Sequence, residues 1–401
     1  MDAVLTEWLS LCLRWLHMVA GMAWIGASFY FIRLDLSLRA DPAIAQGVQG
    51  EAWEVHGGGF YRIAKYSVAP ARMPEELAWF KWEAYTTWLS GFALLVVTYY
   101  IGAELFLIDR SVLDLTPGQA IGVSLGTLLA AWLAYEGLCR SPLGEREYLL
   151  AGIGFLFLVA LFWGFSHVFS GRGTFIQMGA IIGTMMVANV FVVIIPNQKK
   201  MVASLIAGQA PEARLGIAGK QRSVHNNYLT LPVVFLMIGN HYPLMFATRY
   251  SLIIFAIVLA IGFLVRHFYN LRHAGKPNPW WTWAAAAVGM ACVAWLSWTG
   301  ARIAPSAALP AASFAQAQDV VLSRCSMCHS AAPVWEGFVT APRHVLLDTP
   351  ENIRAHAREI EIYAVLTNAM PPDNVTKISD DERRILAAGL APLVAPTLRS
   401  R

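Results

Sequence analysis

Long apolar stretches dominate the first three quarters of the chain and constrain its fold more than any other feature. A helix needs about 20 apolar residues to cross a bilayer core, and eight stretches reach or approach this length. They are Trp8–Phe31, Trp88–Ile108, Gln119–Cys139, Tyr148–His167, Phe175–Ile195, Tyr228–Gly239, Tyr250–His267 and Trp281–Ile303. These stretches are too long and too uniformly apolar for barrel strands. Since only helices and closed barrels satisfy their backbone hydrogen bonds within lipid, the stretches are expected to be helices. We therefore predict an all-α protein built on an eight-helix transmembrane bundle.

The composition agrees with lipid as the main surroundings of the chain. Only 14% of the residues are charged and 57% are hydrophobic, whereas a soluble domain has about 25% charged residues. The 30 basic residues are spread along the loops and do not form a cluster interleaved with aromatic residues. This distribution argues against a nucleic-acid partner and predicts membrane lipid as one.

The loop charges give this bundle an orientation. If the N-terminus lies outside, eight crossings return the C-terminus to the outside as well. The inner loops, together with Arg266 at the inner end of a span, then contain sixteen lysines and arginines, and the outer loops contain only Arg110, Arg172 and Arg249. Because basic residues concentrate in cytoplasmic loops, we predict that both termini lie on the outer side.

A change of composition after Arg302 predicts a second domain. Residues 304–318 are rich in alanine and proline and read as a linker, and the segment that follows has an ordinary content of charged residues. The predicted division is a membrane domain at 1–303, a linker at 304–318 and a small domain at 319–401.

The small domain contains a motif with a specific chemistry, Cys325-Ser326-Met327-Cys328-His329. A Cys-x-x-Cys-His sequence is the attachment signature of a c-type haem. Two thiols on one helical turn can bond to the two haem vinyl groups, and the adjacent imidazole reaches the iron. We predict haem c bound covalently through Cys325 and Cys328, with His329 as an axial ligand.

Met370 is the predicted second axial ligand. Methionine raises the potential of a haem iron, and Pro371 and Pro372 prevent helix formation around it. A final amphipathic helix follows, as expected for a small helical class I cytochrome c domain. The alternative is a zinc site or a redox dithiol, which needs further ligands such as His344 and His356.

Ionisable residues inside the predicted spans are candidates for function. Arg14 and His17 share one face of the first span, and His167 and His241 lie toward the same outer side. Two of these histidines could hold a second haem, of the b type, with Arg14 paired to a propionate. Alternatively, each buried histidine is hydrogen-bonded to a neighbouring helix, and the sequence leaves both interpretations open.

Two polar regions lie at the predicted inner surface. The first inner loop contains His56 before three glycines, and then Lys81 in an aromatic-rich stretch. So long a loop is usually functional or forms a domain of its own. His225, Asn226 and Asn227 precede the sixth span, and their side chains suit a planar heterocycle with alternating donors and acceptors. They suit a helix N-cap equally well.

One combination of motifs extends over nearly the whole chain. It consists of Trp15-Leu16-His17, Gly21–Gly26, His56–Tyr61, Trp79–Tyr85, His225–Pro232, Asn240–Pro243 and the Cys-x-x-Cys-His tail. This combination resembles the bacterial membrane-bound cytochrome c urate oxidases. The resemblance implies a multi-pass protein of the bacterial inner membrane, with the N-terminus and the cytochrome domain in the periplasm. It also implies oxidation of urate to 5-hydroxyisourate in purine catabolism, without formation of hydrogen peroxide.

The resemblance further implies a mechanism. Urate binds among His56, Lys81, His225, Asn226 and Asn227, and a histidine removes a proton, which suits its unperturbed pKa near 6.5. Electrons leave through haem c to an acceptor such as a soluble cytochrome c or a terminal oxidase. Two other classes stay open: a membrane cytochrome that oxidises quinol or another respiratory donor, and a haem-handling or transport protein with a cytochrome tail.

Overall fold

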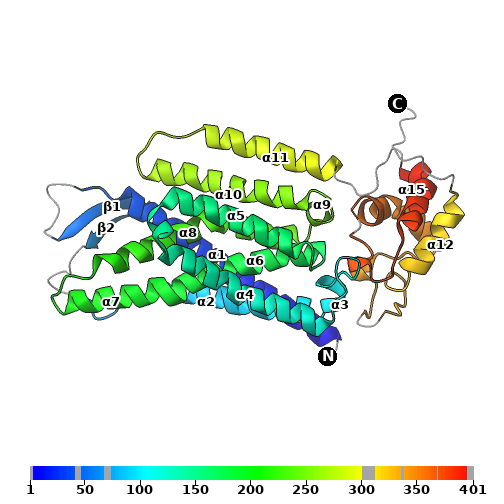
Figure 1. The fold of residues 1–401 in the computed structure, drawn as a ribbon, viewed down its shortest axis with the longest axis horizontal. Coiled ribbons are helices and arrows are strands. Elements are labelled where there is room, and N and C mark those ends of the chain that lie inside the picture. Colours follow the sequence, from blue (N-terminus) through cyan, green and yellow to red (C-terminus); the bar gives the residue numbers. More distant parts are fainter. Residues whose placement is uncertain are drawn as a thin grey trace.

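The fold was obtained as a computed structural model, which describes residues 3–40, 47–66, 74–299, 312–335, 338–367 and 369–394. The chain is mostly helical. Residues 3–299 form a bundle of long helices, and residues 312–394, the C-terminal domain, lie against one end of it (Figure 1).

The long helices of the bundle run along its long axis, and the short α3 and α9 lie at the end near the C-terminal domain (Figure 1). The helices are α1 (Ala3–Ser37), α2 (Trp82–Leu95), α3 (Ala103–Phe106), α4 (Pro117–Arg140), α5 (Glu147–Phe165), α6 (Gly171–Ala188), α7 (Ile195–Ile206), α8 (Ala213–Gly239), α9 (Pro243–Phe246), α10 (Ser251–His273) and α11 (Trp281–Thr299). A π-helical segment, Val96–Tyr100, continues α2, and another, Asn189–Ile194, joins α6 to α7.

Within the described residues, six helices are long and apolar enough to cross a membrane. They are α1, α4, α5, the continuous run from α6 through α7, α10 and α11. The sequence also predicts spans in the regions of α2 and α8. Both helices pack into the bundle, α2 against α1 and α8 against α6 and α10.

The interior of the bundle is closely packed, and its outer face is apolar. Phe162 stacks on Phe255 at 4.5 Å between ring centroids and meets Phe175 edge-on at 5.1 Å. Outside, Trp15 and Trp298 are 72% and 86% exposed. Apolar side chains on an outer surface match lipid tails, whereas in water they would form a large unfavourable patch. The arrangement is consistent with a membrane protein.

The prediction of an all-α fold is wrong in the first inner loop, which forms an antiparallel hairpin. Strands β1 (Val48–His56) and β2 (Gly59–Tyr66) pair from Val48↔Tyr66 to His56↔Gly59. Gly57 and Gly58 have φ of 57° and 80°, the positive values that a two-residue type I′ turn requires. The glycines therefore close a hairpin, which the long apolar stretches of the sequence do not indicate.

Ion pairs fix this hairpin to the bundle. Arg33 of α1 contacts Glu54 of β1 at 2.6 Å. Asp35 of α1 contacts Lys65 of β2 and also Lys220 of α8, the latter at 3.1 Å. One carboxylate thus joins three elements that are distant in the sequence. The hairpin lies at the end of the bundle opposite the C-terminal domain (Figure 1).

The C-terminal domain has a helical core of its own. Its helices are α12 (Phe314–Arg324), α13 (Pro350–Ala355), α14 (Ala357–Ile360) and α15 (Asp380–Val394), with a π-helical segment at Glu361–Leu366. Val321, Ile353 and Leu386 are fully buried between them. A capping box between Ser313 and Gln316 starts α12 inside the predicted 304–318 linker. The part of that linker at 304–311, and the end of the last predicted span at 300–303, lie outside the described residues.

The contact between α12 and α15 makes a specific prediction at Gly389. A Cβ atom there would lie 2.7 Å from both the Ala317 Cβ and the Ser313 carbonyl oxygen. We expect Gly389→Ala to destabilise the C-terminal domain by about 1–3 kcal/mol, because overpacking outweighs the better helix propensity of alanine. Protease resistance of the domain during heating measures the change. Gly137→Ala on α4, where the space is open, is the control, and equal effects of the two would contradict the prediction.

Candidate functional site

The Cys-x-x-Cys-His motif lies where α12 ends. Cys325 is the C-cap of α12, and the amides of Cys328 and His329 donate to its carbonyl oxygen at 3.2 and 3.0 Å. Both cysteines are free thiols. Burial raises the pKa of Cys325 to about 12 and also raises the pKa of Cys328. Each of the two free thiols can add across a vinyl double bond of a haem to form a thioether.

His329 is held in one orientation by the main chain. Its Nδ1 atom lies 2.9 Å from the Val345 carbonyl oxygen, and the Leu347 amide donates to the His329 carbonyl at 2.7 Å. Because a carbonyl only accepts, Nδ1 carries the proton and Nε2 keeps a free lone pair. Metal-binding histidines are commonly oriented by such a bond. The geometry fits an axial iron ligand.

Met370 packs against the same hydrophobic core as Cys325 and Val345. Its amide donates to the Tyr363 carbonyl at 2.8 Å, and the buried Arg383 donates from Nη1 to the Met370 carbonyl at 2.9 Å. These bonds fix the main chain on both sides of the Met370 side chain. One domain therefore gathers two thiols, an oriented imidazole and a held thioether, the donor set that suits haem c.

The alternative of a zinc site has less support. A structural zinc ion takes four ligands, mostly from Cys and His. In the part of the chain that the structure describes, no three His, Cys, Asp or Glu side chains are placed to hold a metal ion. His344 and His356, the extra ligands this alternative needs, do not complete a set with the two cysteines.

A buried polar network surrounds the middle of α8. The Tyr135 hydroxyl lies 2.8 Å from His225 Nδ1, and Asn189 Nδ2 donates to that hydroxyl at 3.0 Å. Asn189 also donates to Asn226 Oδ1 at 2.9 Å, and the Asn226 amide donates to the Met186 carbonyl at 2.9 Å. Asn189 begins a π-helical segment, a distortion frequent at functional sites. The network joins α4, α6 and α8.

Asn227 belongs to a different network. Its Oδ1 accepts hydrogen bonds from Arg266 Nε and Nη2, both at 3.2 Å, and from Asn270 Nδ2 at 3.1 Å. Arg266 is 5% exposed and lies 3.8 Å from the centroid of the Phe29 ring. Asn227 thus faces α10, whereas His225 faces α4.

The interpretation of His225, Asn226 and Asn227 as a helix N-cap is wrong. Helix α8 begins at Ala213, about 18 Å before His225 at about 1.5 Å per residue. The first part of α8 was not recognised because its buried polar residues lower its hydropathy. The three residues therefore lie inside the bundle and not at its inner surface.

The other two residues of the predicted urate site lie elsewhere. His56 is exposed at the end of β1, next to the hairpin turn. Lys81 is the N-cap of α2, and its Nζ lies 5.4 Å from the centroid of the Trp82 ring. The structure does not bring the five residues to one site.

An ion pair that the sequence analysis missed adjoins the His225 network. Arg222 and Glu136 are 3% and 8% exposed, and their side chains meet at 2.9 Å. The more exposed Arg140 contacts Glu136 at 2.6 Å, and Arg222 lies 5.1 Å from the Tyr135 ring centroid. Glu136 and Arg266 are ionisable residues inside predicted spans, so the criterion that selected His17 would have found both.

The residues suggested for a second haem have separate surroundings. His17 Nδ1 lies 2.9 Å from the Thr87 carbonyl of α2, and its ring fills the space beside Gly91. His167 lies in the turn after α5, and its Nδ1 lies 2.7 Å from the Trp163 carbonyl of α5. Arg14 is exposed on α1, and His241 is exposed after the end of α8. The bond of His17 to a neighbouring helix is the arrangement of a packed core histidine, and the second haem stays a prediction.

Comparison with protein-family models matches residues 3–297 to the family described as urate oxidase N-terminal. Neither the curated proteins nor the solved structures contain a match. The matched range includes almost the whole bundle and ends before the C-terminal domain. Because it spans well over half of the 401 residues, the chain belongs to the urate oxidase N-terminal family.

Proposed function

We propose that this protein is a membrane-bound oxidoreductase that converts urate to 5-hydroxyisourate and passes electrons out through a haem c on its C-terminal domain. Membership of the urate oxidase N-terminal family supports urate as the substrate. The electron-transfer part rests on the hydrogen bond between His329 Nδ1 and the Val345 carbonyl, beside the free Cys325 and Cys328.

The reaction has a defined balance. The urate monoanion and one water give 5-hydroxyisourate, one proton and two electrons: a C–O bond forms at the purine C5, the water loses a proton, and the ring system is oxidised. Haem c, when bound, supplies a one-electron acceptor outside the bilayer. Cys325 and Cys328 would hold it covalently, and His329 and Met370 would coordinate its iron. A soluble cytochrome c or a terminal oxidase then takes the electrons.

The shape of the molecule supports the proposed orientation in the bacterial inner membrane. The N-terminus and the C-terminal domain lie at the same end of the bundle (Figure 1), as an even number of crossings requires. The six apolar helices become eight crossings when α2 and α8 are included. The end that carries the hairpin and α7 is rich in lysine and arginine, which supports a cytoplasmic location for this end.

Absorption spectra of the purified, detergent-solubilised protein test this function. Urate is expected to reduce the covalently bound haem under anaerobic conditions, and a quinol analogue is expected not to. Reduction by quinol alone would instead identify a respiratory cytochrome. If neither donor reduces the haem, the transport or haem-handling class is the interpretation that remains.

The prediction that His225 removes a proton from urate has a separate test. A catalytic base contributes about 10²–10⁴ in rate, so a fall of about 100-fold or more in urate-dependent haem reduction in His225→Ala would assign the chemistry to the α8 network. His356→Ala, on the partly exposed surface of the C-terminal domain, is the control. A normal rate in the folded His225 variant would remove His225 from the chemistry.

A further inference from the structure

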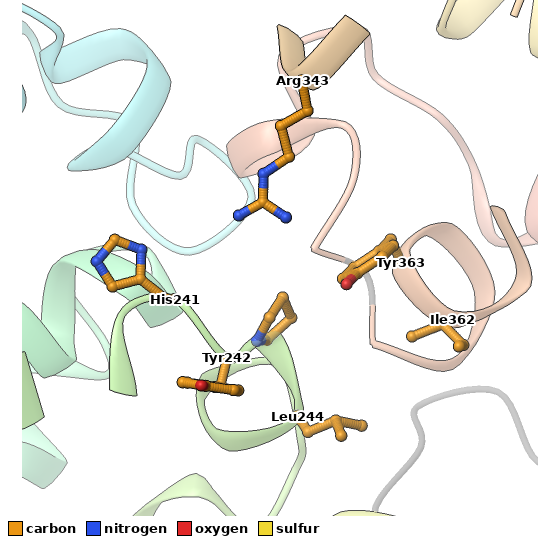
Figure 2. A pocket seen from close by; sticks show the side chains of 7 residues that line it. His241, Tyr242, Leu244, Arg343, Ile362 and Tyr363 are labelled. Atoms are coloured by element: carbon orange, nitrogen blue, oxygen red, sulfur yellow. The ribbon is translucent and has the colours of Figure 1, made fainter. Parts of the chain in front are cut away.

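A cavity separates the bundle from the C-terminal domain. It has a volume of about 330 Å³ and is lined by His241, Tyr242, Pro243, Leu244, Arg343, Ile362 and Tyr363. Figure 2 shows the Arg343 side chain extending from the C-terminal domain into the space between His241 of the bundle and Tyr363. We call it the junction cavity. Its volume is within the range of small-molecule sites, about 300–1,000 Å³.

Positive charge gathers around His241 at the junction cavity. Burial lowers the pKa of His241, and the positive charges of Arg14, Arg172 and Arg343 lower it further, so the three guanidinium groups lie within electrostatic reach of His241. Among the described residues, none of the three makes an ion pair with a carboxylate. Arg172 is held instead between the rings of Phe106 and Phe246, at 5.5 and 5.4 Å. Like charges that face each other across a domain boundary repel unless an anion lies between them.

Both loops that hold the predicted axial ligands contribute to the wall of this cavity. Tyr363 lines the cavity, and its main-chain carbonyl oxygen accepts a hydrogen bond from the Met370 amide at 2.8 Å. Arg343 lies two residues before Val345, whose carbonyl accepts the bond from His329. A molecule in the junction cavity would therefore lie next to the haem side of the C-terminal domain.

The His225 network, by contrast, lies far from the C-terminal domain. His225 lies about 21 Å from the outer end of α8 at Gly239, counting about 1.5 Å per residue. A substrate bound there would be separated from the C-terminal domain by most of the outer half of the bundle. A substrate in the junction cavity would need no intermediate carrier.

We propose that the junction cavity binds the urate monoanion, with the Arg343 guanidinium and the His241 imidazole beside the polar edge of the urate and the rings of Tyr242 and Tyr363 against the purine. A planar guanidinium offers paired donors to an anion with adjacent acceptor atoms, and aromatic faces suit a planar ring. This assignment rests on the proposed function and gives that function a binding site.

The test measures binding and electron transfer separately. Urate binding to the purified full-length protein is measured by isothermal titration calorimetry, and haem reduction is followed with urate and with ascorbate. Arg343→Gln is expected to raise the Kd for urate at least tenfold, because hydrogen bonds to charged groups have effects of about this size or larger, and to leave reduction by ascorbate unchanged. His241→Gln, on the opposite wall, should act in the same direction. Arg384→Gln on α15, whose arginine pairs with Asp381 on the surface, is the matched control.

The outcomes separate this proposal from the proposed function. A wild-type protein that neither binds urate nor is reduced by it overturns the function itself. Normal urate reduction with an unchanged Kd in both Arg343→Gln and His241→Gln overturns only the junction cavity. An altered haem spectrum in Arg343→Gln with unchanged urate affinity would show that the guanidinium serves the haem carboxylates, and this also overturns the proposal.

Discussion

Replacing both Cys325 and Cys328 by alanine is expected to remove the covalently bound haem completely and to abolish urate-dependent electron transfer. The two thiols are the only cysteines of the Cys-x-x-Cys-His motif, and no other side chain can supply a thioether bond to the vinyl groups. Haem stain that survives denaturing electrophoresis measures the covalent bond. The single variants should each retain some pigment bound by one thioether, with a shifted absorption maximum.

Cys12→Ala and Cys292→Ala provide the controls, because both cysteines are exposed on the apolar bundle and lie outside the motif. They should retain full pigment and full activity. Normal activity of the double Cys325/Cys328 variant would show that electrons leave the bundle by another route. Covalent pigment that remains in the double variant would show that the attachment site is elsewhere.

Removing either charge of the buried Glu136–Arg222 pair is expected to destabilise the protein strongly, and the two substitutions are expected to differ in their cost. Breaking a buried ion pair costs about 3–5 kcal/mol, because one charge remains without a partner. Glu136→Gln should cost more than Arg222→Gln. Glu136 keeps its contact with Arg140 at 2.6 Å when Arg222 is changed, whereas Arg222 pairs with no other carboxylate of the described residues.

Thermal unfolding of the solubilised protein, followed by circular dichroism, measures these changes. The double variant Glu136→Gln/Arg222→Gln should recover much of the loss, because both buried charges are then absent. Arg140→Gln is the control, since the Arg140 side chain is 70% exposed and its pair contributes little. Equal costs for the two single variants would contradict the proposed role of Arg140 as a second partner.

Hydropathy predicted the helices whose outer side is apolar and exposed, and it failed for part of a helix that is surrounded by other helices. Helices α10 and α11 were located because an apolar exterior and an apolar core give long hydrophobic stretches. Helix α8 was located only from Tyr228 onward, because Arg222, Asn226 and Asn227 are buried against polar partners on α4, α6 and α10. Buried polar contacts between helices lower the hydropathy of a helix, and the sequence does not show where the partners lie.

Local motifs carried more information than isolated residues about the candidate sites. The Cys-x-x-Cys-His spacing located a turn that the structure forms at the end of α12. The residues chosen one by one for urate were separated, since His56 belongs to a hairpin turn and Asn227 faces Arg266. The junction cavity could not be predicted at all, because Arg343 and His241 meet only when two domains pack together.

The contacts of Asp35 with Lys65 and Lys220 have a geometric consequence for the opposite end of the bundle. They join α1, β2 and α8 at the hairpin end, so these three elements are held together there. Any tilt of α8 relative to α1 then produces its largest displacement at the far end, where α8 leads into His241. Small rotations of α8 about these contacts would therefore widen or narrow the junction cavity.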